Sequence, residues 1–265
     1  IAVGMTYVII TCGIDLSVGS AVGLSAVLTA VFITNLGLHP ILAIILTLIA
    51  GCIIGLVNGF SVAIVKIPPF IITLAMMTIA RGVAFVITGG YPVYIDSSFM
   101  HTIGRGFILG IPTPVYFLVA VYALGSFVLR KTKVGRYVYA VGGNMQTARY
   151  SGINVTAILL FVYILTSMLS ALSGILLSLR LFFGPPNVGT GFELDVIAAT
   201  ILGGTSFAGG EGTVIGTLIG ALLMGVLNNG LNILNVNPYI QMIIKGLVIF
   251  SAVYLSVISS RKKEN

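Results

Sequence analysis

The stretch PILAIILTLIAGCIIGLVNGFSVAI occupies residues 40 to 64 and contains no charged side chain. A helix needs about 20 predominantly apolar residues to cross the roughly 30 Å hydrocarbon core of a bilayer. The stretch exceeds that length, so it predicts a transmembrane helix. The segments on either side of it are expected to meet the same requirement.

Eight further apolar segments flank this stretch. They cover residues 1 to 12, 17 to 34, 70 to 89, 113 to 130, 156 to 182, 193 to 204, 213 to 230 and 239 to 259. Only 7% of the 265 residues are charged and 58% are hydrophobic, whereas about a quarter of an ordinary soluble domain is charged. The composition predicts an all-α polytopic membrane protein with about nine transmembrane helices in a single domain, residues 1 to 265. Because segment 193 to 204 is too short to cross alone, we expect it to cross together with the glycine-rich run that follows.

Basic residues beside the apolar segments predict the orientation of the chain in an inner or plasma membrane. Two basic stretches carry them: Arg130, Lys131, Lys133, Arg136 and Arg149 in the first, and Arg261, Lys262 and Lys263 at the end of the chain. Lys and Arg concentrate in cytoplasmic loops, so both stretches are predicted to be cytoplasmic. The net charge of +7 is explained by this bias and implies no nucleic-acid partner. Counting segments outward leaves residue 1 at the outer face, which predicts a tenth helix upstream in a longer protein.

An internal similarity relates residues 49 to 59 (IAGCIIGLVNG) to residues 219 to 229 (IGALLMGVLNN). Gly55 and Asn58 align with Gly225 and Asn228. An odd number of segments separates the two copies, so they would run in opposite directions, as in transporters built from inverted repeats with broken helices. Chance similarity between two apolar segments is the alternative.

Polar residues within or between the apolar segments are the candidates for a translocation path. An asparagine amide that faced lipid would be unsatisfied, so such side chains should point into the bundle or cap a helix end, here beside Gly59 or Gly230. The runs GIDLSVGS (13 to 20) and GGTSFAGGEG (203 to 212) are either elements of a path or tight turns between helices. The candidates are Asn58, Asn228, Asn229, Asn232, Asp15, Ser17, Thr205 and Ser206.

Charged residues at membrane depth need partners, water or an escape to the interface. Arg180, Glu193 and Asp195 are predicted to form a polar cluster at the outer face, with an ion pair across the turn PPNVGTG. Arg81 and Lys245 lie deeper within apolar segments, and the sequence does not identify their partners.

Six motifs distributed over the whole chain resemble one known family. They are GIDLSVGS (13 to 20), KIPPFIITL (66 to 74), GRYVYAVGGN (135 to 144), SGINV (151 to 155), GFELDVIAATILGGTSFAGGEGT (191 to 213) and LNNGLN (227 to 232). The chain resembles the membrane permease subunit of bacterial ribose-type monosaccharide ABC importers, in the branched-chain amino acid/ribose permease family. The resemblance implies a second permease copy in a homodimer, a cytoplasmic ABC ATPase that holds ATP and Mg, and an extracytoplasmic sugar-binding protein.

Residues 131 to 155 are predicted to form a cytoplasmic coupling loop. Asn144 can cap the N-terminus of a short helix over MQTARYS, and Gly152 can close it. From spacing alone, an ordinary cytoplasmic loop is an equal alternative, and the family resemblance favours docking to the ATPase. The residues assigned to coupling are Gly142, Gly143, Asn144, Arg149, Ser151 and Gly152.

Several chemistries have no motif in this sequence. It has no GxxxxGK[ST] loop, no HExxH pair and no TVGYG filter, so we expect no catalytic, cofactor or metal site. Cys12 and Cys52 are predicted to be buried free thiols.

The leading hypothesis is the permease of an ATP-driven importer of ribose or a similar sugar, working by alternating access among membrane lipids. Because FFGPPNVGTG (182 to 191) departs from the ribose-permease pattern, the sugar stays open. An ion-coupled secondary transporter and a non-transporting membrane scaffold are the alternatives.

Overall fold

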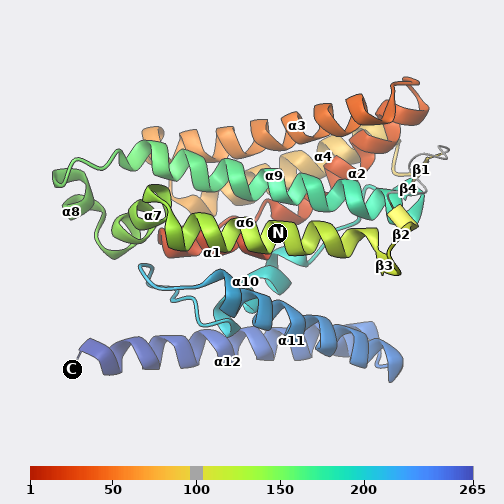
Figure 1. Cartoon of the computed structure of the whole chain (residues 1–265). Helices are drawn as coiled ribbons and strands as arrows, with labels where there is room; N and C mark the ends of the chain where they lie inside the picture. The colour runs from red at the N-terminus through yellow and green to blue at the C-terminus, as the bar shows by residue number, and fades with distance from the viewer. Residues whose placement is uncertain (96–103, 265) are drawn as a thin grey trace. The chain divides into compact units, whose positions relative to one another are not determined.

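The computed structural model describes residues 1 to 95 and 104 to 264, most of which are helical (Figure 1). The helices are α1 (Ala2–Ile10), α2 (Val18–Thr34), α3 (Pro40–Phe60) with the π-helical turn η1 (Ser61–Val65), α4 (Pro69–Thr88), α6 (Thr113–Lys131), α7 (Lys133–Gly143), α8 (Met145–Tyr150), α9 (Val155–Leu181), α10 (Phe192–Leu202), α11 (Val214–Ile233) and α12 (Pro238–Glu264). Two short antiparallel pairs complete the described structure: β1 (Val93–Tyr94) with β4 (Phe183–Gly184), and β2 (Phe107–Ile108) with β3 (Ile111–Pro112).

The all-α prediction is confirmed, and each of the nine apolar segments contains a helix. Within the described residues, five helices are long and apolar enough to cross a membrane: Pro40–Val65, α4, α6, α9 and α11. Two further apolar helices, α2 and Pro238–Tyr254 within α12, are shorter. With 9 and 11 residues, α1 and α10 fall short of the length of a straight crossing. The glycine-rich run 203 to 213 after α10 is not helical, so this segment is broken as predicted.

The chain divides into two compact units. Unit 1 comprises Ile1, Asp15–Val121 and Leu159–Glu193, and unit 2 comprises Ala2–Ile14, Tyr122–Ile158 and Leu194–Asn265.

Helix α2 is the central element of unit 1, because 13 of its 17 residues are buried. One core cluster joins α2 to α3 and α4, and a second joins it to α9. The members of the first are Ala21, Leu24, Val27, Ile54, Ala80 and Ala84, and those of the second include Ala30, Ile33, Ala43, Ile175 and Leu179. Helix α3 approaches α9 through Gly51, Gly55 and Gly59, where added Cβ atoms would press on Ala171, Ile164 and Leu160. Small residues at such spacing let two helix backbones come close together in a membrane.

Unit 2 packs α1 against α11, α7 and α6. The hydroxyl groups of Thr6 and Thr217 lie 2.7 Å apart between α1 and α11. The hydroxyl of Tyr7 donates to the carbonyl of Gly125 in α6 at 2.6 Å. A small apolar cluster around Met224 joins α10, α11 and α12.

The predicted internal repeat has a counterpart in the backbone. Helices α3 and α11, which carry Asn58 and Asn228, contain 21 and 20 residues. After each helix, a non-glycine residue adopts the left-handed conformation: Lys66 at φ 67° and Asn235 at φ 51°. Pro69 and Pro238 begin the next helices, in each case three residues later. Left-handed non-glycine residues are uncommon, so their shared position argues against chance similarity. The opposite direction of the two copies stays a prediction.

Candidate functional site

Asp15, Ser17 and Asn58 come together in unit 1 as a fully buried polar group. Asp15 Oδ1 accepts from the Ser17 backbone N–H at 2.9 Å and from the Ser17 hydroxyl at 2.6 Å. Asn58 Nδ2 donates to Ser17 Oγ at 2.9 Å. All three side chains have 0% exposure, so Asn58 points into the bundle. The alternative that it caps a helix end is wrong, because helical structure continues through η1.

The environment of Asp15 disfavours its charged form. Asp15 lies in the connection between α1 and α2, outside both helices. Burial raises the pKa of its carboxyl to about 6, and hydrogen bonds from Ser17 and Asn58 oppose that rise. Asp15 Oδ2 and Asn58 Oδ1 are buried and accept no hydrogen bond within the described residues.

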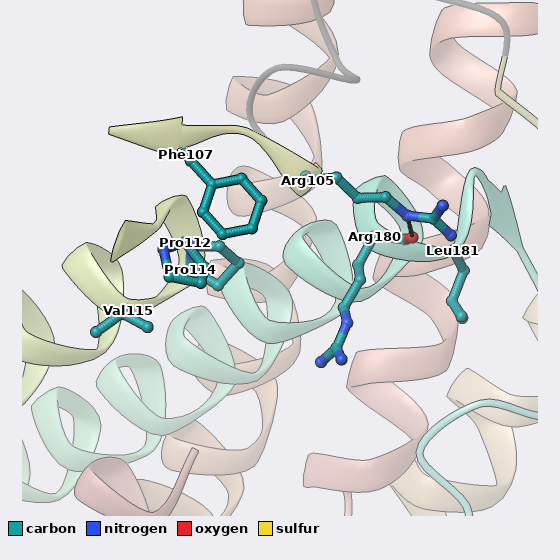
Figure 2. Close-up of a pocket in the computed structure, with 8 residues that line it drawn as sticks. Arg105, Phe107, Pro112, Pro114, Val115, Arg180 and Leu181 are labelled. Atoms are coloured by element: carbon teal, nitrogen blue, oxygen red, sulfur yellow. Dashed lines mark hydrogen bonds between the residues drawn. The ribbon is translucent and has the colours of Figure 1, made fainter. Parts of the chain in front are cut away.

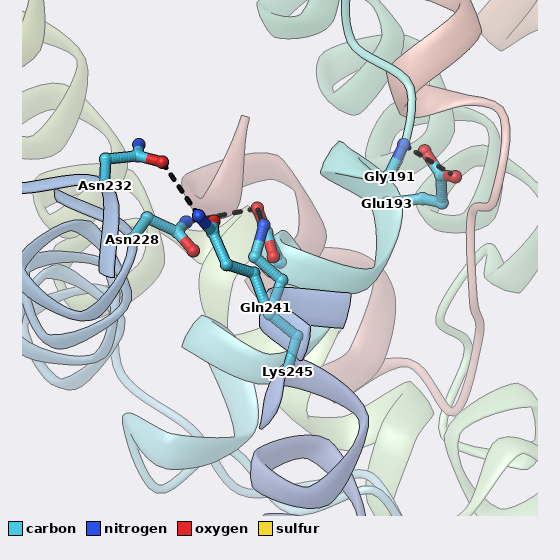
Figure 3. Close-up of polar contacts among 7 residues, drawn as sticks. Gly191, Glu193, Asn228, Asn232, Gln241 and Lys245 are labelled. Carbon is cyan, nitrogen blue, oxygen red and sulfur yellow. Dashed lines mark hydrogen bonds and ion pairs between the residues drawn. The ribbon is translucent and has the colours of Figure 1, made fainter. Parts of the chain in front are cut away.

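Asp195 and Asn228 form the corresponding pair in unit 2, and here a lysine joins them (Figure 3). Asp195 Oδ2 accepts from Lys245 Nζ at 3.0 Å and from Asn228 Nδ2 at 3.3 Å. The side chains of Lys245 and Asp195 are 29% and 18% exposed.

The remaining asparagine candidates lie on the same helix as Asn228. Asn232 accepts a hydrogen bond from Gln241 Nε2 of α12 at 3.1 Å (Figure 3). Asn229 is exposed. Helix α11 continues to Ile233, so Asn228 and Asn229 do not cap its end.

The predicted ion pair between Arg180 and an acid across the turn is wrong for the described residues. Asp195 pairs with Lys245, because an ammonium in the apolar helix α12 needs a carboxylate within reach. Glu193 accepts from the Gly191 backbone N–H at 3.2 Å (Figure 3). The charge of Glu193 also interacts with Arg81. Arg180 is exposed, and its backbone carbonyl oxygen accepts a hydrogen bond from Arg105 Nε at 2.9 Å.

An open cavity of about 670 Å³ lies beside Arg180 in unit 1 (Figure 2). Its lining includes Arg105, Arg180, Phe107, Pro112, Pro114 and Val115. The Arg105 guanidinium lies 4.3 Å from the centre of the Phe182 ring, a cation–π contact.

Arg81 was not assigned a partner from sequence, and the structure supplies one. Its Nη1 donates to the carbonyl oxygens of Pro186 at 2.6 Å and Val188 at 2.8 Å. A signal for this contact exists in the sequence. An arginine inside an apolar helix needs acceptors, and a run with two prolines and several glycines leaves carbonyls outside regular structure.

The short helix predicted after Asn144 is present as α8. Asn144 Oδ1 accepts from the Thr147 backbone N–H at 2.9 Å, and Gly152 is left-handed at φ 82°. These observations confirm the N-cap and the closing glycine. Arg149 and Ser151 are exposed, and Tyr150 is 88% exposed, while Ala148 is buried. Helix α8 therefore presents most of its side chains to the surroundings.

The two glycines before Asn144 have different environments. Gly142 is buried, and a Cβ at that position would collide with the Ile10 carbonyl oxygen. Gly143 is exposed and has open space around it. Gly142 therefore serves packing within unit 2 rather than an exposed surface.

The glycine-rich run 203 to 212 folds as a packed turn against the ends of α1 and α7. Gly210 N–H donates to the Ile10 carbonyl at 2.9 Å, and the Tyr139 hydroxyl donates to the Gly212 carbonyl at 2.6 Å. Thr205 is buried, and Ser206 accepts from the Ala208 N–H within the turn at 3.3 Å. This geometry favours the tight-turn alternative over an open path lining.

Neither cysteine forms a disulfide, but the prediction that both are buried is wrong. Cys12 is exposed because it lies in the left-handed turn that ends α1, at φ 59°. Its thiol donates to the Ala208 carbonyl at 3.0 Å. Cys52 is partly buried.

Apolar helices of crossing length that carry internal polar pairs define a polytopic membrane protein of the transporter class. The sequence model of the family described as "Branched-chain amino acid transport system / permease component" matches residues 1 to 253, and the chain belongs to this family. It is a transport component rather than an enzyme.

Several of the similar proteins are ribose import permease proteins. The one from Haemophilus influenzae is 45% identical over 257 residues, which cover 96% of this chain and 79% of the relative. The one from Bacillus subtilis is 47% identical, with 96% and 80% covered. A xylose transport system permease protein from Escherichia coli is 36% identical, with 99% and 82% covered. No solved structure matches the chain.

Proposed function

We propose that this chain is the membrane permease of an ATP-driven importer that carries ribose or a similar monosaccharide into the cell. The observation that carries the proposal is its 45 to 47% identity, over nearly its whole length, to ribose import permease proteins. The xylose relative, at 36% identity, supports a pentose as the substrate class. The chain works as a homodimer by alternating access, and a binding protein delivers the sugar from outside.

Helix α8 is the element of this chain that contacts the ATPase. Its exposed side chains, its Asn144 cap and its place in the basic stretch support this role. Residues 131 to 155 and the C-terminus are then cytoplasmic, in line with the positive residues they carry. ATP and Mg are held by the ATPase, and this chain contributes the docking surface.

Movement of α8 reaches the spanning helices through the contacts around Gly142. Helix α7 leads directly into α8, and the end of α7 packs on Ile10 of α1 and on the turn 205 to 212. Because these contacts join backbone atoms at close range, a displacement of α7 must also displace α1 and the turn.

Uptake by the reconstituted complex tests the proposal. Permease, ATPase and binding protein are placed in liposomes and supplied with labelled ribose, xylose, arabinose and glucose in turn. We expect uptake of a pentose that requires ATP inside the compartment corresponding to the cytoplasm. Uptake driven by an ion gradient without ATP would support the secondary transporter instead.

A further inference from the structure

The segment 183 to 191 follows helix α2 through unit 1. Thr34 Oγ1, at the C-terminal end of α2, donates to the Tyr94 carbonyl of β1 at 2.6 Å, and β1 pairs with β4, where the segment begins. A Cβ built on Gly184 would lie 3.0 Å from Ala30 Cβ. One built on Gly189 would collide with the Gly19 carbonyl oxygen in the first turn of α2. The segment therefore runs from the C-terminal half of α2 to its N-terminus.

This path carries non-helical backbone to considerable depth. Gly184 lies against the Ala26 carbonyl and Gly189 against the Gly19 carbonyl, and residues 19 to 26 of α2 span about 10 Å at about 1.5 Å per residue. Residues 186 to 191 form turns along this path. Helix α2 is also packed by α3, α4 and α9. Irregular backbone at membrane depth persists only where protein buries it or where it lines a water-filled cavity.

Arg81 fixes this backbone in place. It lies in α4, seven residues before the helix ends at Thr88, which is about 10 Å from that end. Its two hydrogen bonds go to the carbonyls of Pro186 and Val188, at the middle of the segment. A Cβ on Gly23 would lie 2.8 Å from the Val188 carbonyl oxygen, so α2 also accommodates the segment closely there.

The segment has two sides. Pro186 and Gly189 are buried, whereas Asn187 and Thr190 are exposed. The Asn187 amide makes no side-chain hydrogen bond within the described residues, and the Thr190 hydroxyl donates to the Asn187 carbonyl at 2.7 Å. The segment thus presents a free amide, with donors and an acceptor, and a hydroxyl oxygen that can still accept.

We infer that segment 183 to 191 is the part of the permease that reads the sugar, with Asn187 and Thr190 hydrogen-bonding its hydroxyl groups. Arg81 is the positioning residue that holds the segment at depth. A neutral polyol needs both donors and acceptors from its site, and these two side chains offer both. The inference rests on the proposed function, since it assigns the sugar contacts of that importer.

Uptake by variants of the complete importer provides the first test. Asn187→Ala and Thr190→Val are compared with Asn35→Ala and Thr78→Val, whose residues are also exposed polar positions of unit 1. Losing one hydrogen bond of about 1 kcal/mol reduces a rate several-fold. We expect Asn187→Ala and Thr190→Val to lower ribose uptake at saturating binding protein several-fold and to alter the ribose-to-xylose ratio. Both controls keep the parental rate and ratio. Unchanged rates and ratios in Asn187→Ala and Thr190→Val would overturn the inference.

Cysteine labelling provides a second test that does not depend on the uptake ratio. In a Cys12→Ser, Cys52→Ser background, Asn187→Cys and Asn35→Cys are treated with a charged, membrane-impermeant thiol reagent, with and without ribose and the binding protein. We expect modification at position 187 to block uptake and to be slowed by sugar, and modification at position 35 to do neither. If the importer takes up ribose but the cysteine at position 187 does not react with the reagent, the inference is overturned and the proposed function stands. A parental complex that imports no sugar overturns the proposed function.

Discussion

The two units handle the same polar pair in different ways. In unit 1, Asp15 is buried beside Ser17 and Asn58, and no cation pairs with it among the described residues. In unit 2, Asp195 contacts Asn228 but is partly exposed and paired with Lys245. An unpaired buried carboxylate is costly unless it is protonated or well hydrogen-bonded. The equivalent asparagines of the repeat, Asn58 and Asn228, thus each belong to a polar group with an aspartate, but the electrostatics of the two groups differ.

Because of this difference, we expect the two units to be sensitive to different kinds of substitution. The pair in unit 1 depends on buried neutral hydrogen bonds, so changes of size and of protonation should disturb it most. The pair in unit 2 depends on the Lys245 ammonium of α12, so substitutions that change charge should disturb it most. Unit 2 also carries α8 and the contacts around Gly142, whereas unit 1 carries segment 183 to 191.

Removing residues 144 to 150, which belong to unit 2, should have the largest effect on transport and should leave the structure of unit 1 unchanged. We expect sugar uptake to fall to background and the ATPase to be lost on co-purification, because α8 is the proposed docking element and most of its side chains are exposed. Protease protection and immunoblotting check that the variant is inserted in the membrane at parental levels. Uptake that persists in an inserted variant would remove the coupling role of α8.

Gly142→Ala should have the next largest effect, and Gly143→Ala is its matched control. A Cβ at position 142 meets the Ile10 carbonyl oxygen, whereas one at position 143 meets nothing within 4 Å. Overpacking of this kind costs about 1 to 3 kcal/mol. We expect Gly142→Ala to lower the thermal midpoint of the purified protein and to reduce uptake several-fold. Equal behaviour of the two variants would contradict the tight contact between α7 and α1.

The loss of stability caused by Asn58→Ala can be compared directly with the loss caused by Asn228→Ala. Asn58 has 0% exposure, and its loss removes the amide that donates to the buried Ser17 hydroxyl. A buried polar group left unsatisfied costs about 1 to 3 kcal/mol. The cost for Asn228 should be about 1 kcal/mol or less, because Lys245 still holds Asp195 and the site is partly exposed. Thermal unfolding in detergent measures the order, and a larger loss for Asn228→Ala would reverse our assignment.

Asp15→Asn should produce the smallest effect, and that effect should depend on pH. The raised pKa of Asp15, about 6 against an ordinary 3.8, means that the folded protein loses stability as pH rises through the interval between these values. Asn cannot ionise, so the variant escapes this loss. We expect Asp15→Asn to be more stable than the parent by a few degrees at pH 8 and by less at pH 5. Asp195→Asn, which loses an ion pair, should be less stable at pH 8.

The sequence predicted those features that depend on nearby residues. Apolar runs located the helices because about 20 such residues suffice to cross a membrane. Asn144 and Gly152 predicted α8 because capping involves only neighbouring residues. The partners of the charges could not be predicted in this way. Lys245 lies 50 residues from Asp195, and Arg81 lies 105 residues from Pro186. Arg180 and Asp195 are closer in sequence, but this proximity does not bring them into an ion pair.

The contact between α3 and α9 has a mechanical consequence. Gly51, Gly55 and Gly59 lie against backbone atoms of α9 and against side-chain atoms of Ala171 and Leu160, so α3 itself contributes no side chain to that line of contact. Interlocked side chains resist sliding because each must change rotamer before its helix can advance. A smooth seam lets one helix glide along the other by small steps, which is the shear type of movement that packed helices use. The three glycines thus allow α3 to slide along α9, and replacing any one of them with alanine would hinder this movement.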